Sequence, residues 1–362
     1  MHNTPTPTPA PNPAPNPAPA VQQAPAIPSP IPPAPGPQGA QGAHTATAAG
    51  AAPKTFLLGV GAQKAGTTWM YDYLSRHPGT AMGRIKEYAV FGGADPAGLL
   101  QGRCRARLRD LRAEAGDWLQ ALKQNAADPA GTSAGGTELP DPAALLDLMD
   151  MLALELDPGR APLHFDRLLA QTPGAHVTGD ITPAYSGLPA QDFARIRALM
   201  EGGGYQVKVV FLLRDPVERC WSALRMHDRN LANAGRSPKR PAHERFATEG
   251  RADWNTARTR YDHTLAALEA VFAPGDIFCA LYEEFISEAG VRDLTRFLGL
   301  DWHPPRLAHR ANASPGDVPA PSARAIAQVR DHYAPVYAFC AARFGEDRIR
   351  RLWPHAAAVL DR

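Results

Sequence analysis

Short runs of apolar residues, each followed by a polar or glycine-containing segment, predict a series of buried strands. Three runs, residues 56–60, 207–213 and 277–281, are apolar almost throughout, which is typical of strands buried on both faces of a parallel sheet. After the first run, a glycine-containing loop over residues 61–66 leads into a predicted helix over residues 67–77. Pro78 and Gly79 end that helix.

Predicted helices alternate with these strands. One helix runs from Pro216 to about Asp228, with Asp215 as its N-cap. Two more are predicted over residues 261–272 and near residues 291–298. The alternation predicts an α/β fold of the P-loop type, with three layers in which helices flank a central parallel sheet.

Two segments depart from this alternation. Residues 95–165 contain two helical stretches, 103–122 and 143–156, separated by a Gly/Ser/Thr/Pro-rich loop, and we interpret them as a helical insertion or lid within one domain. Residues 229–256 are rich in Arg, Asn, Ala and Pro, and they are predicted to form an irregular surface segment.

Proline divides the chain into a tail and a domain. Residues 1–53 hold 16 of the 37 prolines and contain no Lys, Arg, Asp or Glu. This composition predicts a disordered tail of polyproline II character over residues 1–53, followed by one domain over residues 54–362. The tail is expected to act as a spacer, and a ligand for a proline-recognition domain is the alternative.

Charge and cysteine content exclude several functions. The formal net charge of +2 provides no global field for nucleic acid, and no apolar run reaches the about 18 residues that a membrane span needs. The four cysteines are far apart and form no CxxC pair, so we expect reduced thiols and no metal site.

No secretory signal is evident, so a cytoplasmic location is predicted. Nothing in the sequence indicates the oligomeric state.

The loop over residues 61–66 resembles a phosphate-binding loop but departs from the kinase pattern GxxxxGK[ST]. Gly61, Gly66 and Thr68 match that pattern, whereas Thr67 stands in place of the lysine and Lys64 lies three residues earlier. Backbone N–H groups and the helix dipole would still bind phosphate there. A P-loop kinase or NTPase is therefore one hypothesis, although its lysine is displaced and no convincing acidic strand end for magnesium follows.

Two motifs together are similar to those of PAPS-dependent sulfotransferases, in particular the branch shared by heparan sulfate sulfotransferases and many bacterial enzymes. Residues 63–69 (QKAGTTW) resemble the family's phosphosulfate loop, and residues 214–222 (RDPVERCWS) resemble its 3′-phosphate motif. Weaker matches extend the resemblance over roughly residues 55–315. The resemblance implies transfer of the sulfuryl group of PAPS (3′-phosphoadenosine 5′-phosphosulfate) to a hydroxyl, with PAP as product and no metal. The expected acceptor is a carbohydrate, a glycoconjugate or another small molecule.

The resemblance also implies which residues bind PAPS. Lys64 would neutralise charge on the departing phosphate, and Arg214 and Ser222 would bind the 3′-phosphate. A loop late in the chain would close over the adenine through Arg310 and Asn312. The phosphosulfate would be held by Gln63, Lys64, Ala65, Gly66, Thr67 and Thr68.

On the acceptor side, the resemblance places a catalytic base at Glu87, with Lys86 beside it. Lys86, Asp180 and Tyr185 are candidate substrate-binding residues. A surface role is the alternative for Lys86, and capping or bracing of a loop is the alternative for Asp180. The heparan-type pattern commonly has Glu-Lys where this chain has Asp180-Ile181, which weakens the case for a heparan-like acceptor. His164 and His176 are possible substitutes for the base, although neither lies in a supporting pattern. A scaffold that binds nucleotide but has lost transfer activity remains a further hypothesis.

Overall fold

The five strands of the computed structural model, which describes residues 53–92, 101–127, 142–307 and 318–362, form one parallel sheet. Their order across the sheet is β2-β3-β1-β4-β5. The strands are β1 (Thr55–Gly61), β2 (Thr80–Ala81), β3 (Val177–Ile181), β4 (Gln206–Leu213) and β5 (Ile277–Leu281).

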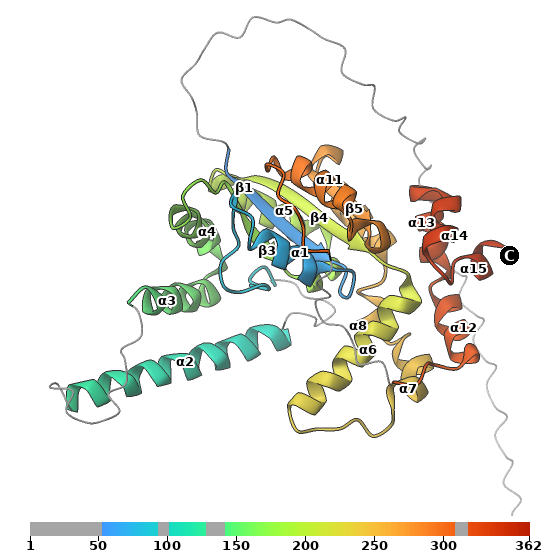
Figure 1. Ribbon diagram of the computed structural model, residues 1–362, viewed down its shortest axis with the longest axis horizontal. Coiled ribbons are helices and arrows are strands. Elements are labelled where there is room, and N and C mark those ends of the chain that lie inside the picture. The colour runs from blue at the N-terminus through green and yellow to red at the C-terminus, as the bar shows by residue number, and fades with distance from the viewer. Residues whose placement is uncertain (1–52, 93–100, 128–141, 308–317) are drawn as a thin grey trace, which may run out of the picture. The chain divides into compact units, whose positions relative to one another are not determined.

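Helices flank the sheet, as Figure 1 shows, and the predicted α/β fold with a central parallel sheet is confirmed. The α-helices within the described residues are α1 (Thr67–Leu74), α2 (Gln101–Ala127), α3 (Pro142–Leu156), α4 (Ala161–Ala170), α5 (Ala190–Gly202), α6 (Pro216–Asn233), α7 (Ala242–Glu249), α8 (Asp253–Thr256), α9 (Tyr261–Glu269), α10 (Tyr282–Phe285), α11 (Glu288–Leu298), α12 (Ala323–His332), α13 (Ala334–Phe344), α14 (Glu346–Leu352) and α15 (Ala357–Leu360). Three short 3-10 helices join them, η1 (Pro158–Arg160), η2 (Pro183–Gly187) and η3 (Pro274–Asp276).

The connections of the sheet change direction between β1 and β4. From β1 the chain moves to β2 and β3 on one side, and from β4 it moves to β5 on the other side. In parallel α/β sheets, ligands bind at the carboxyl ends of the strands where such a change occurs. The segments that follow Gly61 and Leu213 begin at this point.

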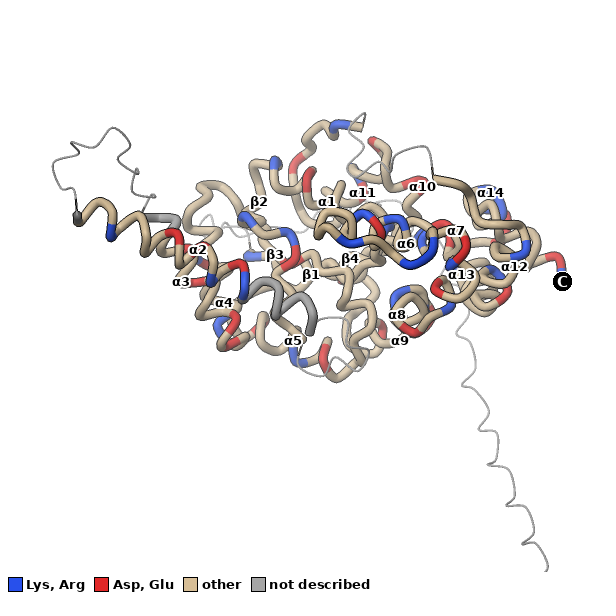
Figure 2. The backbone as a smooth tube through the Cα atoms, turned by 90° about the horizontal axis from the view of Figure 1, so that it is seen from below, with Lys and Arg blue, Asp and Glu red and all other residues tan. Residues whose placement is uncertain are grey.

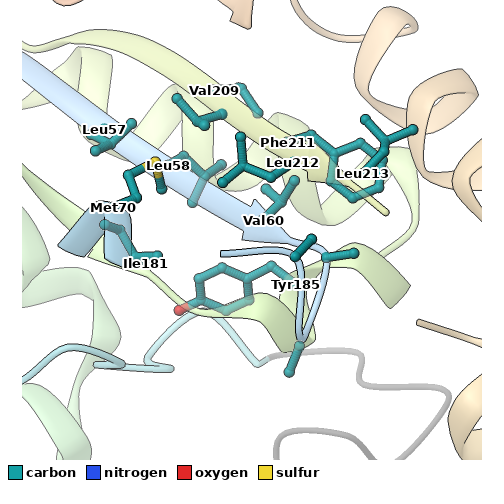
Figure 3. Close-up of a cluster of buried hydrophobic side chains, with 14 of the residues drawn as sticks. Leu57, Leu58, Val60, Met70, Ile181, Tyr185, Val209, Phe211, Leu212 and Leu213 are labelled. Atoms are coloured by element: carbon teal, nitrogen blue, oxygen red, sulfur yellow. The ribbon is translucent and has the colours of Figure 1, made fainter. Parts of the chain in front are cut away.

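The core lies along β1 and β4. Every residue of β1 is buried, and the last five residues of β4 are buried as well, as expected for strands covered on both faces. Figure 3 shows Leu57, Leu58 and Val60 of β1 beside Val209 and Phe211 of β4, with Met70 of α1 nearby. This packing fixes the strand ends from which the candidate site is built.

Several predicted boundaries differ from the structure. The helix after β1 ends at Leu74 and not at residue 77, and α6 runs past Asp228 to Asn233. The prediction of an irregular segment over residues 229–256 is wrong, because α7 and α8 lie within it. Within α7, Ala242, Arg245 and Phe246 are buried at helical spacing, a signal that the polar composition of the segment concealed.

Sequence patterns missed two strands and the C-terminal helices. The strand β2 has only two residues, and β3 contains a glycine and an aspartate, which both have low strand propensity. In the C-terminal helical region, Trp353 is fully buried and its ring packs against Tyr261 and Tyr337. This region therefore belongs to the same core as β4.

Two groups of predictions concern residues outside the described ranges. The tail over residues 1–53 lies outside them except for Pro53, and so do Arg310 and Asn312. In the predicted insertion, α2 and α3 confirm two helices, with α2 longer than expected at both ends. The role of that segment as a lid stays a prediction.

Candidate functional site

The two motifs that resemble sulfotransferase sequences lie against each other at the carboxyl ends of β1 and β4. Residues 61–66, here called the phosphate loop, follow β1 directly. The Ala62 N–H donates to the Leu212 carbonyl of β4 at 2.6 Å. One residue past β4, Nη1 of Arg214 donates to the Lys64 carbonyl at 3.1 Å. The second motif is thus bound to the backbone of the first.

The phosphate loop is shaped by two left-handed residues. Lys64 has a φ of 73° although it carries a side chain, a conformation that is uncommon outside glycine and often found at functional sites. Gly66 has a φ of 90°, and a Cβ there would lie 3.0 Å from the Tyr282 ring. Gly66 caps α1 without a side chain, so the first N–H groups of α1 remain available to an anion.

Lys64 lies among other cations. Burial, which has the largest effect, and the nearby charges of Arg229, Arg214, Arg225 and Lys86 together lower the pKa of its ammonium to about 8. A cluster of like charges is unfavourable unless an anion occupies it. The electrostatics therefore fit a ligand with more than one negative group.

Arg214 is held on two sides. Its guanidinium lies over the Tyr282 ring at 5.0 Å from the ring centroid, and Nη2 contacts Oε2 of Glu218 at 3.4 Å. A hydrogen bond from His355 and the charges of the neighbouring arginines lower the pKa of the Glu218 carboxyl below its usual range, although burial acts in the opposite direction. Ser222, two turns further along α6, is buried on the same helix.

Asp215 anchors the start of α6, and its predicted role as N-cap is confirmed. Its Oδ1 accepts hydrogen bonds from the N–H groups of Val217 at 2.8 Å and Glu218 at 3.1 Å. Tyr337 donates to the same oxygen at 2.9 Å, and the His355 N–H contacts Oδ2 at 3.3 Å. The C-terminal helices thereby fix the helix that carries Ser222.

The candidate base lies in a second loop, residues 82–92, here called the Glu87 loop. Lys86 Nζ and Oε1 of Glu87 form an ion pair of 2.7 Å, and both side chains are largely enclosed. The Tyr71 hydroxyl donates to the Gly83 carbonyl at 2.9 Å, which ties this loop to α1. The charge of Lys86 also reaches Lys64, so the two loops face a common region.

Asp180 holds the Glu87 loop in place. This residue of β3 is completely buried, and its carboxylate accepts hydrogen bonds from the N–H groups of Tyr88 at 3.0 Å and Ala89 at 3.1 Å. The hydroxyls of Thr182 and Tyr185 each donate to it at 2.6 Å. The geometry favours the loop-bracing alternative for Asp180 over contact with an acceptor.

Tyr185 is part of the same brace. It is completely buried, and its hydroxyl accepts a hydrogen bond from the Phe91 N–H at 3.2 Å. Its role as an acceptor-binding residue stays a prediction that this arrangement does not favour. Residues 180–185 instead bond the backbone of residues 88–91, which directly follow Glu87.

Sequence reasoning missed Arg225 and Arg229 of α6. They follow Ser222 by three and seven residues, so all three share one face of the helix, and this spacing was the signal available. The two histidines considered as alternative bases each make a hydrogen bond with a residue outside the Glu87 loop. His164 is buried against Asp150, and His176 contacts the Gly299 carbonyl at 3.1 Å.

Other observations bear on the ligand. The Oε1 atom of Gln63 is buried and has no hydrogen-bond partner within the described ranges, which suits a loop that closes on a bound molecule. In the same part of the chain, no group of three or more His, Cys, Asp or Glu side chains is arranged to hold a metal. None of the described helices is both long and apolar enough to span a membrane.

Comparisons with known proteins give remote similarities. No family model and no curated protein matches the chain. A sulfotransferase from Alicyclobacillus acidocaldarius is 19% identical, with a TM-score of 0.43, and the alignment covers 83% of this chain and 96% of that one. A sulfotransferase domain from the curacin biosynthetic pathway is 13% identical, with a TM-score of 0.37, and the alignment covers 73% of this chain and 81% of that one.

A third similar solved structure is a sulfotransferase domain from the Synechococcus PCC 7002 olefin synthase, which is 14% identical with a TM-score of 0.36. The alignment covers 78% of this chain and 94% of that domain.

Proposed function

We propose that this protein is a sulfotransferase that moves the sulfuryl group of PAPS to the hydroxyl of an acceptor. The observation that carries the proposal is the hydrogen bond from Arg214 to the Lys64 carbonyl. It joins a loop suited to one phosphate group to a helix start suited to another, as a nucleotide with anions at both ends requires.

The residues present fit such a nucleotide. The available amides of the first turn of α1, together with the Lys64 ammonium, form an anion-binding cradle within residues 63–68. Thr67 and Thr68 add hydroxyls to this cradle. For the 3′-phosphate, Arg214 lies just before α6 and Ser222 lies on that helix. PAPS, when bound, would supply a sulfuryl group attached to a good phosphate leaving group.

Three side chains would then perform the transfer. The Lys64 ammonium stabilises negative charge as it develops on the leaving phosphate. Glu87 accepts the proton of the acceptor hydroxyl, and Lys86 holds the Glu87 carboxylate in position at 2.7 Å. A base fixed in this way also orients the hydroxyl toward the sulfuryl group.

The central experiment measures PAP binding by titration calorimetry and transfer of radiolabelled sulfate from PAPS to a panel of hydroxylated carbohydrates and phenols. We expect PAP to bind, and Lys64→Ala to weaken binding about tenfold and turnover by about 10²–10³. The matched control is Lys54→Ala, because Lys54 forms a 2.7 Å ion pair with Asp166 away from both loops.

The other outcomes separate the alternatives. A protein that binds neither PAP nor PAPS is not a PAPS-dependent sulfotransferase. Magnesium-dependent ATP turnover that survives Lys64→Ala would identify a P-loop NTPase. Tight PAP binding with no transfer to any acceptor and no slow hydrolysis of PAPS would identify a nucleotide-binding scaffold.

A further inference from the structure

One face of α6 carries a row of basic side chains beyond the part assigned to the nucleotide. Ser222, Arg225 and Arg229 lie on this face, here called the basic face of α6, and Figure 2 shows basic residues recurring along the helix. With a rise of 1.5 Å per residue, Arg225 and Arg229 lie about 4.5 Å and 10.5 Å beyond Ser222 along the helix axis.

Arg225 is held in a defined position. Its guanidinium lies over the Trp221 ring, 5.4 Å from the centroid, and Trp221 in turn packs edge-on against Phe246. The Nε atom of Arg225 is enclosed and has no hydrogen-bond partner among the residues that the structure describes. A desolvated donor of this kind lacks a bond that an anionic ligand would supply.

The surroundings of Arg225 leave its charge poorly balanced. Burial lowers the pKa of its guanidinium, and Arg214 and Arg229 act in the same direction, whereas Glu218 opposes them. Glu218 is shared with Arg214 at 3.4 Å and with His355 at 3.6 Å. One carboxylate with three basic neighbours therefore leaves room for an additional negative charge.

The nucleotide does not account for this charge. In the proposed function, Arg214 and Ser222 hold the 3′-phosphate, and Lys64 with the phosphate loop holds the phosphosulfate. Arg225 and Arg229 stand further along α6, and their charges and that of Lys86 all reach the Lys64 ammonium. Lys86 is paired with Glu87, the candidate base, so the two arginines and the candidate base surround the same ammonium, which the acceptor hydroxyl must approach.

We propose that Arg225 and Arg229 form a subsite for an anionic group of the acceptor, so that the sulfated molecule carries a carboxylate or phosphate near its reacting hydroxyl. This inference rests on the proposed function and names the substrate class of the same site. Two arginines suit the task because a guanidinium bonds both oxygens of a carboxylate or phosphate.

The test uses the full chain saturated with PAP and measures acceptor binding by calorimetry at low salt. One pair of probes is 4-nitrophenyl β-glucuronide and 4-nitrophenyl β-glucoside, which differ only at C6, a carboxylate in the first and a hydroxymethyl group in the second. The second pair is glucose 6-phosphate and glucose. We expect the charged member of at least one pair to bind at least tenfold more tightly, and the responsive pair identifies carboxylate or phosphate as the group recognised.

Variants assign that preference to the basic face of α6. We expect R225Q/R229Q to bind both members of the responsive pair equally, while its PAP affinity stays within threefold of the native value. R225K, which retains the charge without the Nε donor, should keep part of the preference. The matched control is R236Q/R240Q, which removes two exposed charges from the segment after α6 and should keep all of it.

Three results would overturn the inference. The first is equal binding within both pairs by the native protein. The second is a preference that survives in R225Q/R229Q, and the third is a loss of PAP affinity in that variant, which would assign the two arginines to the nucleotide. A native protein that binds no PAP fails the proposed function itself, and this inference with it.

Discussion

The two loops of the candidate site are held in different ways. The phosphate loop is bonded to the neighbouring strand and its extension, through the Leu212 carbonyl and the Arg214 guanidinium. The Glu87 loop is bonded mainly to side chains of residues 180–185, above all to the buried carboxylate of Asp180. The first loop is thus specified by sheet geometry, and the second depends on a few side chains that lie about 90 positions later in the chain.

This difference suggests a division of work between the loops. A loop fixed by the sheet suits the constant part of a reaction, here the proposed nucleotide donor. A loop braced by side chains can change its position when those side chains change, which suits recognition of a variable acceptor. Substitutions in the two loops should therefore produce different kinetic signatures.

The largest expected effect comes from Glu87→Gln. Removing the proposed base should lower kcat by about 10²–10⁴ and leave PAP affinity within twofold, because Gln cannot take the proton. Single-turnover transfer from PAPS and PAP titration measure the two quantities. Glu201→Gln, an exposed carboxylate paired with Arg197 at 2.7 Å, is the matched control.

Other effects of Glu87→Gln on PAP affinity and turnover would contradict the different roles proposed for the two loops. If Glu87→Gln weakens PAP binding as much as it slows transfer, both loops serve the nucleotide. If turnover is unchanged, Glu87 is not the base, and the assignment of the phosphate loop is unaffected.

Next in size is the effect of Asp180→Asn on stability. The substitution places an amide donor among four donors, so we expect the free energy of unfolding to fall by about 3 kcal/mol. Urea denaturation measures this loss, and hydrogen exchange of the Tyr88 and Ala89 amides should accelerate more than that of the β1 amides. Asp192→Asn is the control, since Asp192 is also buried but bonds Arg195 at 2.9 Å.

Hydrogen exchange in Asp180→Asn also shows which loop is destabilised. Faster exchange in the Glu87 loop alone, with β1 and the phosphate loop still protected, would mean that the Asp180 carboxylate holds the Glu87 loop and not the phosphate loop. A loss no greater than that of Asp192→Asn would mean that the Glu87 loop is held by other contacts.

The smallest expected effect is a pH dependence of PAP binding. Lys64 has a pKa of about 8, so its ammonium is charged below that pH and loses its proton above it. Because PAP favours the charged form, affinity should fall about tenfold from pH 7 to pH 9. In Lys64→Arg the fall should disappear, because guanidinium stays charged. A native profile as flat as that of the variant would place the Lys64 ammonium outside the anion site.

The two loops also differ in how far the sequence predicted them. The phosphate loop, the Asp215 cap and the apolar strands β1 and β4 are encoded within a few neighbouring residues, and local patterns were sufficient. The bracing role of Asp180 depends on β3, a buried strand whose glycine and aspartate contradict strand propensity. Only the tertiary structure brings its carboxylate under the Glu87 loop.

Arg225 and Arg229 were missed for a related reason. The motif comparison stopped at Ser222, although the helix continues for eleven more residues to Asn233. Helical spacing shows that the three side chains share a face, but it does not show what the face meets. The proximity of Lys64, which belongs to another strand-to-helix connection, supplied that information.

The pairing of β1 with β4 determines how far apart the two segments of the candidate site begin. The two segments that we propose bind the anions start from adjacent strands, whose separation is set by backbone hydrogen bonds at about 4.8 Å. In the proposed function, the strand pairing therefore sets the distance between the two negative groups that a ligand must have. Side-chain substitutions can weaken binding at either site, but only a shift in strand register would change the distance between the sites.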